Sequence, residues 1–330
     1  MYIIRNAHLS DLDDLYSLSK KADLLNLPSD IEKLRYLISK SDNSFKSPNE
    51  NLEENYYIFC LVNKKTSKVI GVSMIHGKHG TEDQPHYYLK VGKEVKESSS
   101  LNKKIVNGTL KLGIEPNGFT EIGGLILDPS FRGSGEKLGK QLSMCRFLYI
   151  IQNSKHFTKE IHSELLPPFD ENGKSLLWEG LGRKFLNMDY WEADILSQKD
   201  KSFIHDLFPS STIYLNLLPQ SSIDVIGEVG KNTQPVKKML EDIGFEYTEE
   251  VDPFDGGPHY RAKLTDLRPY KEFCTIKKDT LSKTLNEKNF FISDETEKNN
   301  NPAVHFIAKA INANNINEAS NKELFKGFYI

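Results

Sequence analysis

The chain has 330 residues, of which 38% are hydrophobic and 27% are charged, and its formal net charge at pH 7 is −3. This composition is that of an ordinary soluble globular protein, and the length favours two modules over one. The near balance of acids and bases lacks the strong positive charge typical of nucleic-acid-binding proteins, and the lysines are expected on a solvated surface.

The first residues lack the basic start and long apolar core of a signal peptide, and no stretch approaches the roughly 18 to 20 apolar residues of a membrane span. The three cysteines, Cys60, Cys145 and Cys274, are odd in number and far apart, which suits a reducing compartment. We therefore expect a cytoplasmic protein. No pair of cysteines or histidines has zinc-ligand spacing, so no metal site is expected, and His259 is interpreted as a turn residue.

Hydrophobic periodicity and turn residues predict a first series of elements as far as residue 165. They are a strand at 2–5, a helix from 11 capped by Ser10, a helix after 29, a loop at 43–55, strands at 56–62 and 69–75, an insertion at 80–118, a strand at 119–127, a helix to about 153 and a strand at 159–165. This order indicates an α+β fold with a mixed, largely antiparallel sheet flanked by helices.

The second half continues with shorter elements. They are a helix leading into a strand at 176–190, a strand at 212–218, a helix at 234–243, a strand-turn-strand at 244–264 with its turn at Asp255, and a strand at 304–309. The segments 284–302 and 311–321 are rich in Asn, Lys and Glu, and are expected to be exposed connections.

The most informative stretch is GGLILDPSFRGSGEKLGKQL, residues 123–142, where a strand ends and a glycine-rich turn leads into a helix. Glycines let the backbone approach a ligand closely, and a helix N-terminus favours negative charge. Such a turn suits the phosphates of coenzyme A. Arg132 and Gly135 fit the phosphate-binding signature of GNAT acyltransferases, and Leu138 with Gly139 completes it after two extra residues. A bare Gly-x-Gly is more often only a turn former, so the element order has to support this interpretation.

The ending typical of a GNAT domain, an apolar residue followed by Gly and Phe, occurs twice. The first copy is at 177–185 and the second at 239–245. We therefore predict a GNAT domain at residues 1–198 and a C-terminal α/β module at 199–330, which is a degenerate GNAT-like repeat or a partial one. The alternative is ordinary helix capping by glycine.

Read together, six stretches resemble the arginine N-succinyltransferase family over residues 1 to about 270. They are IRNAHLSDLDDL, FTEIGGLILDPSFR, SMCRFLYI, DENGKSLLWEGLGRKFLNMDYWEAD, FIHDLFPSSTIYLNLLP and VDPFDGGP. The resemblance implies transfer of succinyl from succinyl-CoA, a co-substrate and no prosthetic group, to the α-amine of arginine. It also implies small-molecule partners, neither nucleic acid nor membrane, and a homo-oligomer or a pairing with a homologous chain.

The resemblance also implies roles for particular residues. The CoA contacts would be Leu125, Leu127, Arg132, Gly133, Ser134, Gly135, Leu138 and Gly139, with Leu125 matching the family's CoA-contact leucine. The catalytic candidates are Glu121, Glu164 and Tyr190, and Lys90 is a substrate-binding candidate. His162 or a solvent proton are further candidates for the acid.

The chain departs from the family's pattern at several positions. Gly230 stands where the family has its proton-donor histidine, Lys90 and Lys96 replace an arginine and a histidine, and Leu166-Pro167 replaces an arginine and a glycine. A second hypothesis is therefore a catalytically silent chain that binds CoA or pairs with an active subunit. A third is a protein or peptide acetyltransferase.

Overall fold

The structure is a computed structural model. It describes residues 2–22, 27–197, 199–285, 289–294, 303–313, 315–316 and 324–330. The chain forms two compact units, each made of separate segments. Unit 1 comprises Met1–Lys78, Thr120–Ile161 and Lys263–Ile330, and unit 2 comprises His79–Phe119 and His162–Ala262.

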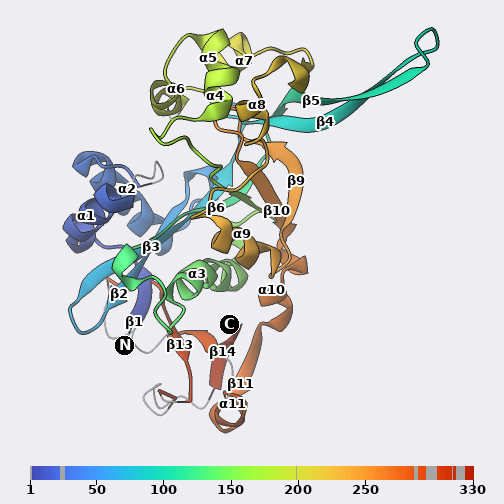
Figure 1. The fold of residues 1–330 in the computed structure, drawn as a ribbon. Coiled ribbons are helices and arrows are strands. Elements are labelled where there is room, and N and C mark those ends of the chain that lie inside the picture. The colour runs from blue at the N-terminus through green and yellow to red at the C-terminus, as the bar shows by residue number, and fades with distance from the viewer. Residues whose placement is uncertain are drawn as a thin grey trace. The chain divides into compact units, whose positions relative to one another are not determined.

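Unit 1 contains a sheet with the strand order β11-β14-β12-β13-β1-β2-β3-β6 (Figure 1). Its strands are β1 (Tyr2–Asn6), β2 (Tyr56–Asn63), β3 (Lys68–His79), β6 (Phe119–Leu127), β11 (Cys274–Lys277), β12 (Phe290–Ser293), β13 (Ile307–Ile311) and β14 (Leu324–Tyr329). Its helices are α1 (Leu12–Ala22), α2 (Ile31–Lys46), α3 (Leu138–Gln152), α10 (Arg268–Glu272) and α11 (Lys278–Thr284). The strand pairs whose register the described residues give are antiparallel, for example Ile4 with Leu61 and Ile4 with Ala308.

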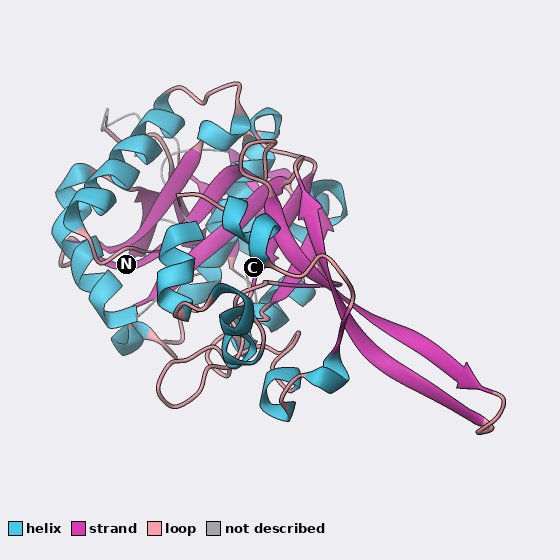
Figure 2. Ribbon diagram, turned by 90° about the horizontal axis from the view of Figure 1, so that it is seen from above, coloured by secondary structure: helices cyan, strands magenta, loops and turns pink. Residues whose placement is uncertain are grey.

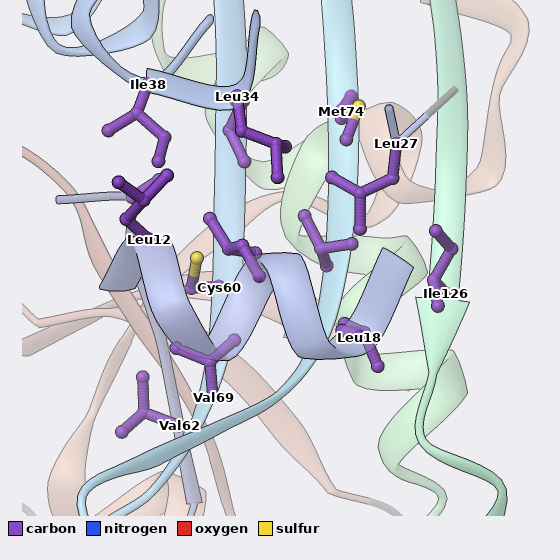
Figure 3. Close-up of a cluster of buried hydrophobic side chains, with 14 residues drawn as sticks. Leu12, Leu18, Leu27, Leu34, Ile38, Cys60, Val62, Val69, Met74 and Ile126 are labelled. Carbon is purple, nitrogen blue, oxygen red and sulfur yellow. The ribbon is translucent and has the colours of Figure 1, made fainter. Parts of the chain in front are cut away.

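Apolar residues at helical spacing place α1 and α2 on one face of this sheet. Asp30 begins α2 by accepting a hydrogen bond from the Lys33 amide at 2.8 Å. Leucines of both helices pack against side chains of β2, β3 and β6 (Figure 3). Full burial of each such leucine contributes roughly 2 kcal/mol, so this layer fixes β6 in its place.

Unit 2 contains the strand order β7-β10-β9-β4-β5-β8. Its strands are β4 (His86–Ser98), β5 (Lys103–Glu115), β8 (Ile213–Tyr214), β9 (Glu246–Val251) and β10 (Pro258–Lys263), with β7 (Glu160–Glu164) beginning in unit 1. Its helices are α4 (Leu176–Gly180), α5 (Gly182–Leu186), α6 (Tyr190–Ser197), α7 (Ser202–Leu207), α8 (Gln220–Ile223) and α9 (Gln234–Glu241). The fully buried Trp178 stacks on Phe254 with ring centroids 5.1 Å apart, and it centres the packing of α4.

The predicted insertion at 80–118 is a long two-stranded ribbon of β4 and β5 (Figure 2). The two strands pair along their whole length, from His86 with Glu115 to Ser98 with Lys103. Beyond the pairs with β9 and β8, the distal half of the ribbon exposes apolar side chains, among them Val95, Ile105 and Val106.

Several of the local predictions were wrong. Ser10 lies inside a 3-10 turn at Leu9–Asp11 and does not cap α1, which begins at Leu12. Helix α2 extends into the loop predicted at 43–55, and the strand predicted at 212–218 is only β8, which a 3-10 helix at Leu215–Leu217 follows. The strand expected near residue 190 is helix α6, because Asn187 adopts a left-handed conformation that ends α5 and lets a new helix begin at Tyr190. The segment 284–302 was expected to be an exposed connection, yet β12 lies in it and buries Phe290 and Phe291. Strand β14, which buries Phe328, follows the segment 311–321 at positions for which no element was predicted. The predicted strand at 304–309 is β13, displaced toward the C-terminus. The parts of those segments at 286–288, 295–302, 314 and 317–321 lie outside the described residues.

None of the described helices is both long enough and apolar enough to span a membrane. The sequence analysis divided the chain differently, into a domain at 1–198 and a repeat-like module at 199–330. That division stays a prediction.

Candidate functional site

The glycine-rich turn lies in unit 1 between β6 and α3. Asp128 directly follows the strand. Its carboxylate forms an ion pair with Lys21 at 2.7 Å and accepts a hydrogen bond from the Ser130 amide. These contacts hold the pKa of Asp128 at about 2. The following residues, Arg132 to Lys137, are all exposed. The turn is therefore open to a ligand from solvent.

Helix α3 begins without a side-chain cap. Its N-cap residue, Lys137, has a φ of 53°, and the side chain of this residue makes no capping hydrogen bond. Gly133 has a φ of 73°, and a Cβ there would meet no atom within 4 Å. A helix N-terminus preceded by open glycine backbone is an arrangement that binds phosphate groups, because amide dipoles converge on it. Leu138 itself is buried, so only its backbone is available for such a contact.

Strand β6 is irregular just before the turn. Its side chains alternate between buried and partly buried, with Ile122 and Ile126 in the core and Leu125 and Leu127 on the other face. Gly124 has a φ of 55°, and a Cβ there would lie 2.6 Å from the Met74 sulfur. This backbone departs from a regular strand beside Leu125 and Leu127, two of the predicted CoA contacts.

A buried arginine on α3 supports this irregular backbone. Arg146 is 2% exposed, and its Nη1 donates to the Gly123 carbonyl at 3.2 Å. Its Nε and Nη2 donate to the backbone carbonyl and the hydroxyl of Ser143 at 3.1 and 2.8 Å. Burial lowers the pKa of Arg146 to about 10. The guanidinium therefore joins α3 to β6 through neutral oxygens.

Glu121 lies on β6, on the same face as Leu125, and is partly buried. The Tyr56 hydroxyl donates to the Met74 sulfur at 2.9 Å, and burial together with the charge of Glu121 raises the pKa of Tyr56. A ring nitrogen of His76 lies within 4.8 Å of a Glu121 carboxylate oxygen. Glu121 thus has polar neighbours in unit 1 and lies on the strand that leads into the turn.

Glu164 lies in unit 2, among three imidazoles. Its Oε1 is 3.4 Å from His162 Nε2, 3.7 Å from His86 Nδ1 and 3.9 Å from His259 Nε2. Burial and the neighbouring imidazoles lower the pKa of His86 well below its usual value, and burial lowers the pKa of His259 to about 3. Both rings are therefore neutral at physiological pH.

Tyr190 is buried in unit 2 beside Trp178 and Phe169. Its hydroxyl donates to Asp255 Oδ2 at 3.4 Å. Burial and nearby acids raise the pKa of Tyr190, and burial is the main cause that raises the pKa of Asp255 to about 7. Tyr190 is therefore protonated at neutral pH and is oriented by the turn at Asp255.

Lys90 lies on β4 of unit 2. Its Nζ donates to the Thr248 carbonyl at 2.7 Å and lies 3.9 Å from carboxylate oxygens of Glu249 and Glu250. Lys90, the candidate for binding a substrate carboxylate, is thus held against strand β9.

Gly230 and the Leu166-Pro167 segment, at both of which the chain departs from the family's pattern, are in direct contact. The Gly230 amide donates to the Leu166 carbonyl at 2.9 Å, and a Cβ at position 230 would lie 2.8 Å from the Pro167 carbonyl oxygen. The glycine and the Leu166-Pro167 segment therefore form one close backbone contact that a histidine at position 230 would disrupt.

This contact leads to a prediction for the variant Gly230→Ala. Since the opposing atom belongs to the backbone, relief requires a shift of the chain, and we expect a loss of about 1–3 kcal/mol in the free energy of unfolding. Urea denaturation measures it. The control is Gly135→Ala, because a Cβ at Gly135 would meet no atom within 4 Å. Equal stability of the two variants would show that the contact at position 230 relaxes freely.

The structure brings some of the sequence candidates together and separates others. Glu121 and the eight candidates for CoA contact lie in unit 1, on β6, the turn and the start of α3, whereas Glu164, Tyr190 and Lys90 lie in unit 2. His86 and His259, which surround Glu164, were not among the candidates. One signal in the sequence marks them, because each is the middle residue of a Pro-His-Tyr triplet that opens a strand.

The model of the family described as arginine N-succinyltransferase beta subunit matches residues 2–269. This chain belongs to the arginine N-succinyltransferase family. The arginine N-succinyltransferase of Yersinia pestis strain Pestoides F is 33% identical over 297 residues, which cover 89% of this chain and 82% of that protein. The enzyme of the same name from Escherichia coli O6:K15:H31 is 33% identical over 275 residues, covering 82% and 79%.

A solved structure gives the same fold over nearly the whole chain. The arginine/ornithine succinyltransferase subunit AI from Pseudomonas aeruginosa superposes with a TM-score of 0.79 at 21% identity, covering 99% of this chain and 98% of that one. The predicted family and the α+β GNAT fold with its mixed sheet are confirmed. As a member of the arginine N-succinyltransferase family, the chain is an acyltransferase.

Proposed function

We propose that this chain transfers a succinyl group from succinyl-CoA to the α-amine of arginine in a ternary complex. The observation that supports it most directly is the exposed glycine turn at the uncapped N-terminus of α3, which directly follows β6. The choice of succinyl group and arginine follows from the name of the relatives, arginine N-succinyltransferase. No observation favours the silent-subunit hypothesis.

We assign the CoA contacts to unit 1. The pyrophosphate and 3′-phosphate would bind the turn through Arg132, Gly133, Ser134 and Gly135 and through the amides of Leu138 and Gly139. The pantetheine amides would pair with the backbone of Leu125 and Leu127, as an added strand does. The Arg132 Nε donates to the Leu127 carbonyl at 3.3 Å, which holds the guanidinium at the start of the turn.

The reaction begins when the arginine α-amine loses its ammonium proton to a base. The neutral amine attacks the thioester carbonyl, a C–N bond forms, the C–S bond breaks, and the thiolate of CoA takes up a proton. Glu121 is the proposed base, because it lies on the strand that would bind the pantetheine arm. Glu164 is the second candidate, Tyr190 or a solvent proton the acid, and Lys90 a site for a substrate carboxylate.

The reaction is proposed to take place in the cytoplasm, with the chain in a homo-oligomer or paired with a homologous chain. The division into a GNAT domain at 1–198 and a second α/β module at 199–330 remains part of this proposal.

The test is release of CoA thiol by the purified chain, with succinyl-CoA or acetyl-CoA offered against arginine, ornithine and lysine. We expect turnover to be fastest with succinyl-CoA and arginine. If every pair is silent while calorimetry shows CoA binding, the chain is a binding or partner subunit, and the proposed reaction is wrong.

The variant Arg132→Ala is expected to raise KM for the acyl-CoA about tenfold, with kcat little changed. The reason is that one charge-assisted contact to phosphate is lost, and such contacts are worth about 1.5 kcal/mol. Steady-state kinetics measure both constants. The control is Arg268→Ala, which removes an equal charge from α10 of the same unit, where Arg268 pairs with Glu272. A similar KM in both variants would exclude Arg132 from the site.

A further inference from the structure

Three buried histidines surround Glu164 in unit 2, and the proposed acyl transfer uses none of the three. We propose that His86, His162, His259 and Glu164 bind a divalent transition-metal ion, zinc by preference, within unit 2. This inference goes beyond the proposed function, and it removes Glu164 from the acid–base candidates.

The four donors converge in space although they are far apart in the sequence. One nitrogen from each histidine and one Glu164 oxygen all lie within 4.8 Å of one another. The three imidazole centroids form a nearly equilateral triangle with sides of 4.9, 5.0 and 4.9 Å. The sheet sets this arrangement, because His162 and Glu164 project from the same face of β7, and His259 lies on the adjacent strand β10.

The distances fit four-coordinate zinc better than they fit direct hydrogen bonds. Zinc bonds of 2.0–2.1 Å at tetrahedral angles place neighbouring donors about 3.3 Å apart. The distances from Glu164 Oε1 to the three nitrogens are 3.4, 3.7 and 3.9 Å. Two of them are too long for a hydrogen bond, and all three exceed the spacing of a zinc shell by only about 0.1 to 0.6 Å.

Several ring nitrogens of these imidazoles have no hydrogen-bond partner in the described part of the chain. Both ring nitrogens of His259 are buried without a hydrogen-bond partner, as are His86 Nε2 and His162 Nδ1. His259 is 0% exposed, and its Nε2 is the nitrogen directed at Glu164. Burying an unpaired polar atom is costly, and coordination of a cation would satisfy His259 Nε2, the one of these four nitrogens that faces Glu164.

The charges also suit a cation. The Glu164 carboxylate faces three imidazoles, and imidazole nitrogen and carboxylate oxygen are both zinc ligands. The nearby basic side chain Arg261 donates to Glu250 at 2.8 Å and lies over the Phe119 ring, so it pairs with other groups. The Glu164 side chain is 30% exposed, which gives an ion access from solvent.

The full chain, prepared without a polyhistidine tag and stripped with a chelator, is titrated with Co²⁺ and then with Zn²⁺. We expect about one equivalent of Co²⁺ to give the intense visible bands of four-coordinate cobalt, and Zn²⁺ to displace it. Zn²⁺ should also raise Tm, because the ion stabilises only the folded form. A cluster that shares a proton in place of a metal would bind neither ion, and that result overturns the proposal.

Two variants and one control locate the site. His162→Asn and Glu164→Gln should weaken Zn²⁺ binding at least ~100-fold, because loss of a ligand costs no less than loss of its outer-shell support. His205→Asn changes an exposed histidine of the same unit and should bind as the wild type does. Unchanged binding in both site variants would overturn the assignment. Should they fail to fold, zinc-edge X-ray absorption of the wild type decides, since three imidazoles and one oxygen are expected and a shell dominated by water contradicts the proposal.

Discussion

Replacing Glu121 by glutamine is expected to lower kcat for succinyl transfer about 100- to 1,000-fold. A positioned base contributes roughly 10² to 10⁴ in rate, and the amide keeps the size of the side chain while losing its ability to accept the ammonium proton. KM for the acyl-CoA should change little, because the turn and the start of α3 are untouched. In a plot of kcat/KM against pH, one limb reports ionisation of the base. This limb should disappear in the variant.

The control for this variant is Glu32→Gln, which neutralises an exposed carboxylate on α2 of the same unit. A decrease of less than threefold in kcat for Glu121→Gln would transfer the role of base to another group. The same kinetics on Glu164→Gln then separate the two candidates. If Glu164 is a metal ligand and not the base, its variant loses zinc, and the pH dependence of the remaining activity keeps the limb that Glu121 supplies.

Replacing Arg146 is expected to separate stability from CoA binding. Arg146→Ala leaves a cavity and an unpaired Gly123 carbonyl in the core between α3 and β6, so we expect a loss of about 3 kcal/mol or more in the free energy of unfolding. Arg146→Met fills most of the volume and removes a buried charge, and such replacements are often neutral for stability. Urea denaturation compares the two.

The methionine variant should still show a higher KM for acyl-CoA, because the irregular backbone at Gly123 and Gly124 loses the donor that anchors it. We expect an increase of about tenfold, equivalent to ~1.4 kcal/mol, the value of one hydrogen bond. An unchanged KM in a stable Arg146→Met protein would show that β6 keeps its shape through packing alone, with Gly124 against Met74 as the remaining constraint.

The turn and its neighbours were predictable from the sequence because their signals are local. Pro129, Gly133 and Gly135 lie close together in the sequence, and a buried strand precedes them while an apolar helix follows. The family resemblance rests on stretches of the same kind. Glu121 was chosen as a candidate in this way, since it lies on the strand that runs into the turn.

The imidazole cluster could not be predicted in the same way. Its donors come from positions 86, 162, 164 and 259, and only the order of the strands in the sheet brings them together. No ligand spacing exists along the chain, which is why the sequence predicted no metal site. The register of long-range strand pairs depends on packing over the whole sheet, and local propensity does not contain it.

Strand β12 was missed for a compositional reason. Phe290 to Ser293 is a short apolar run beside segments rich in Asn, Lys and Glu, and such surroundings are typical of loops. The run becomes a strand because β13 and β14 pair with it on both sides. Tertiary pairing therefore decides an element that the composition of its surroundings disfavours.

The position of β1 between β2 and β13 has a consequence for folding on the ribosome. Ile4 pairs with Leu61 on one side and Ala308 on the other, and the Asn6 side chain accepts from the Phe306 amide, 300 residues along the chain. The sheet of unit 1 therefore stays incomplete until almost the whole chain has been synthesised, and one edge of β1 waits unpaired in the nascent protein. Such distant closure predicts slow folding and a period in which chaperones protect that edge.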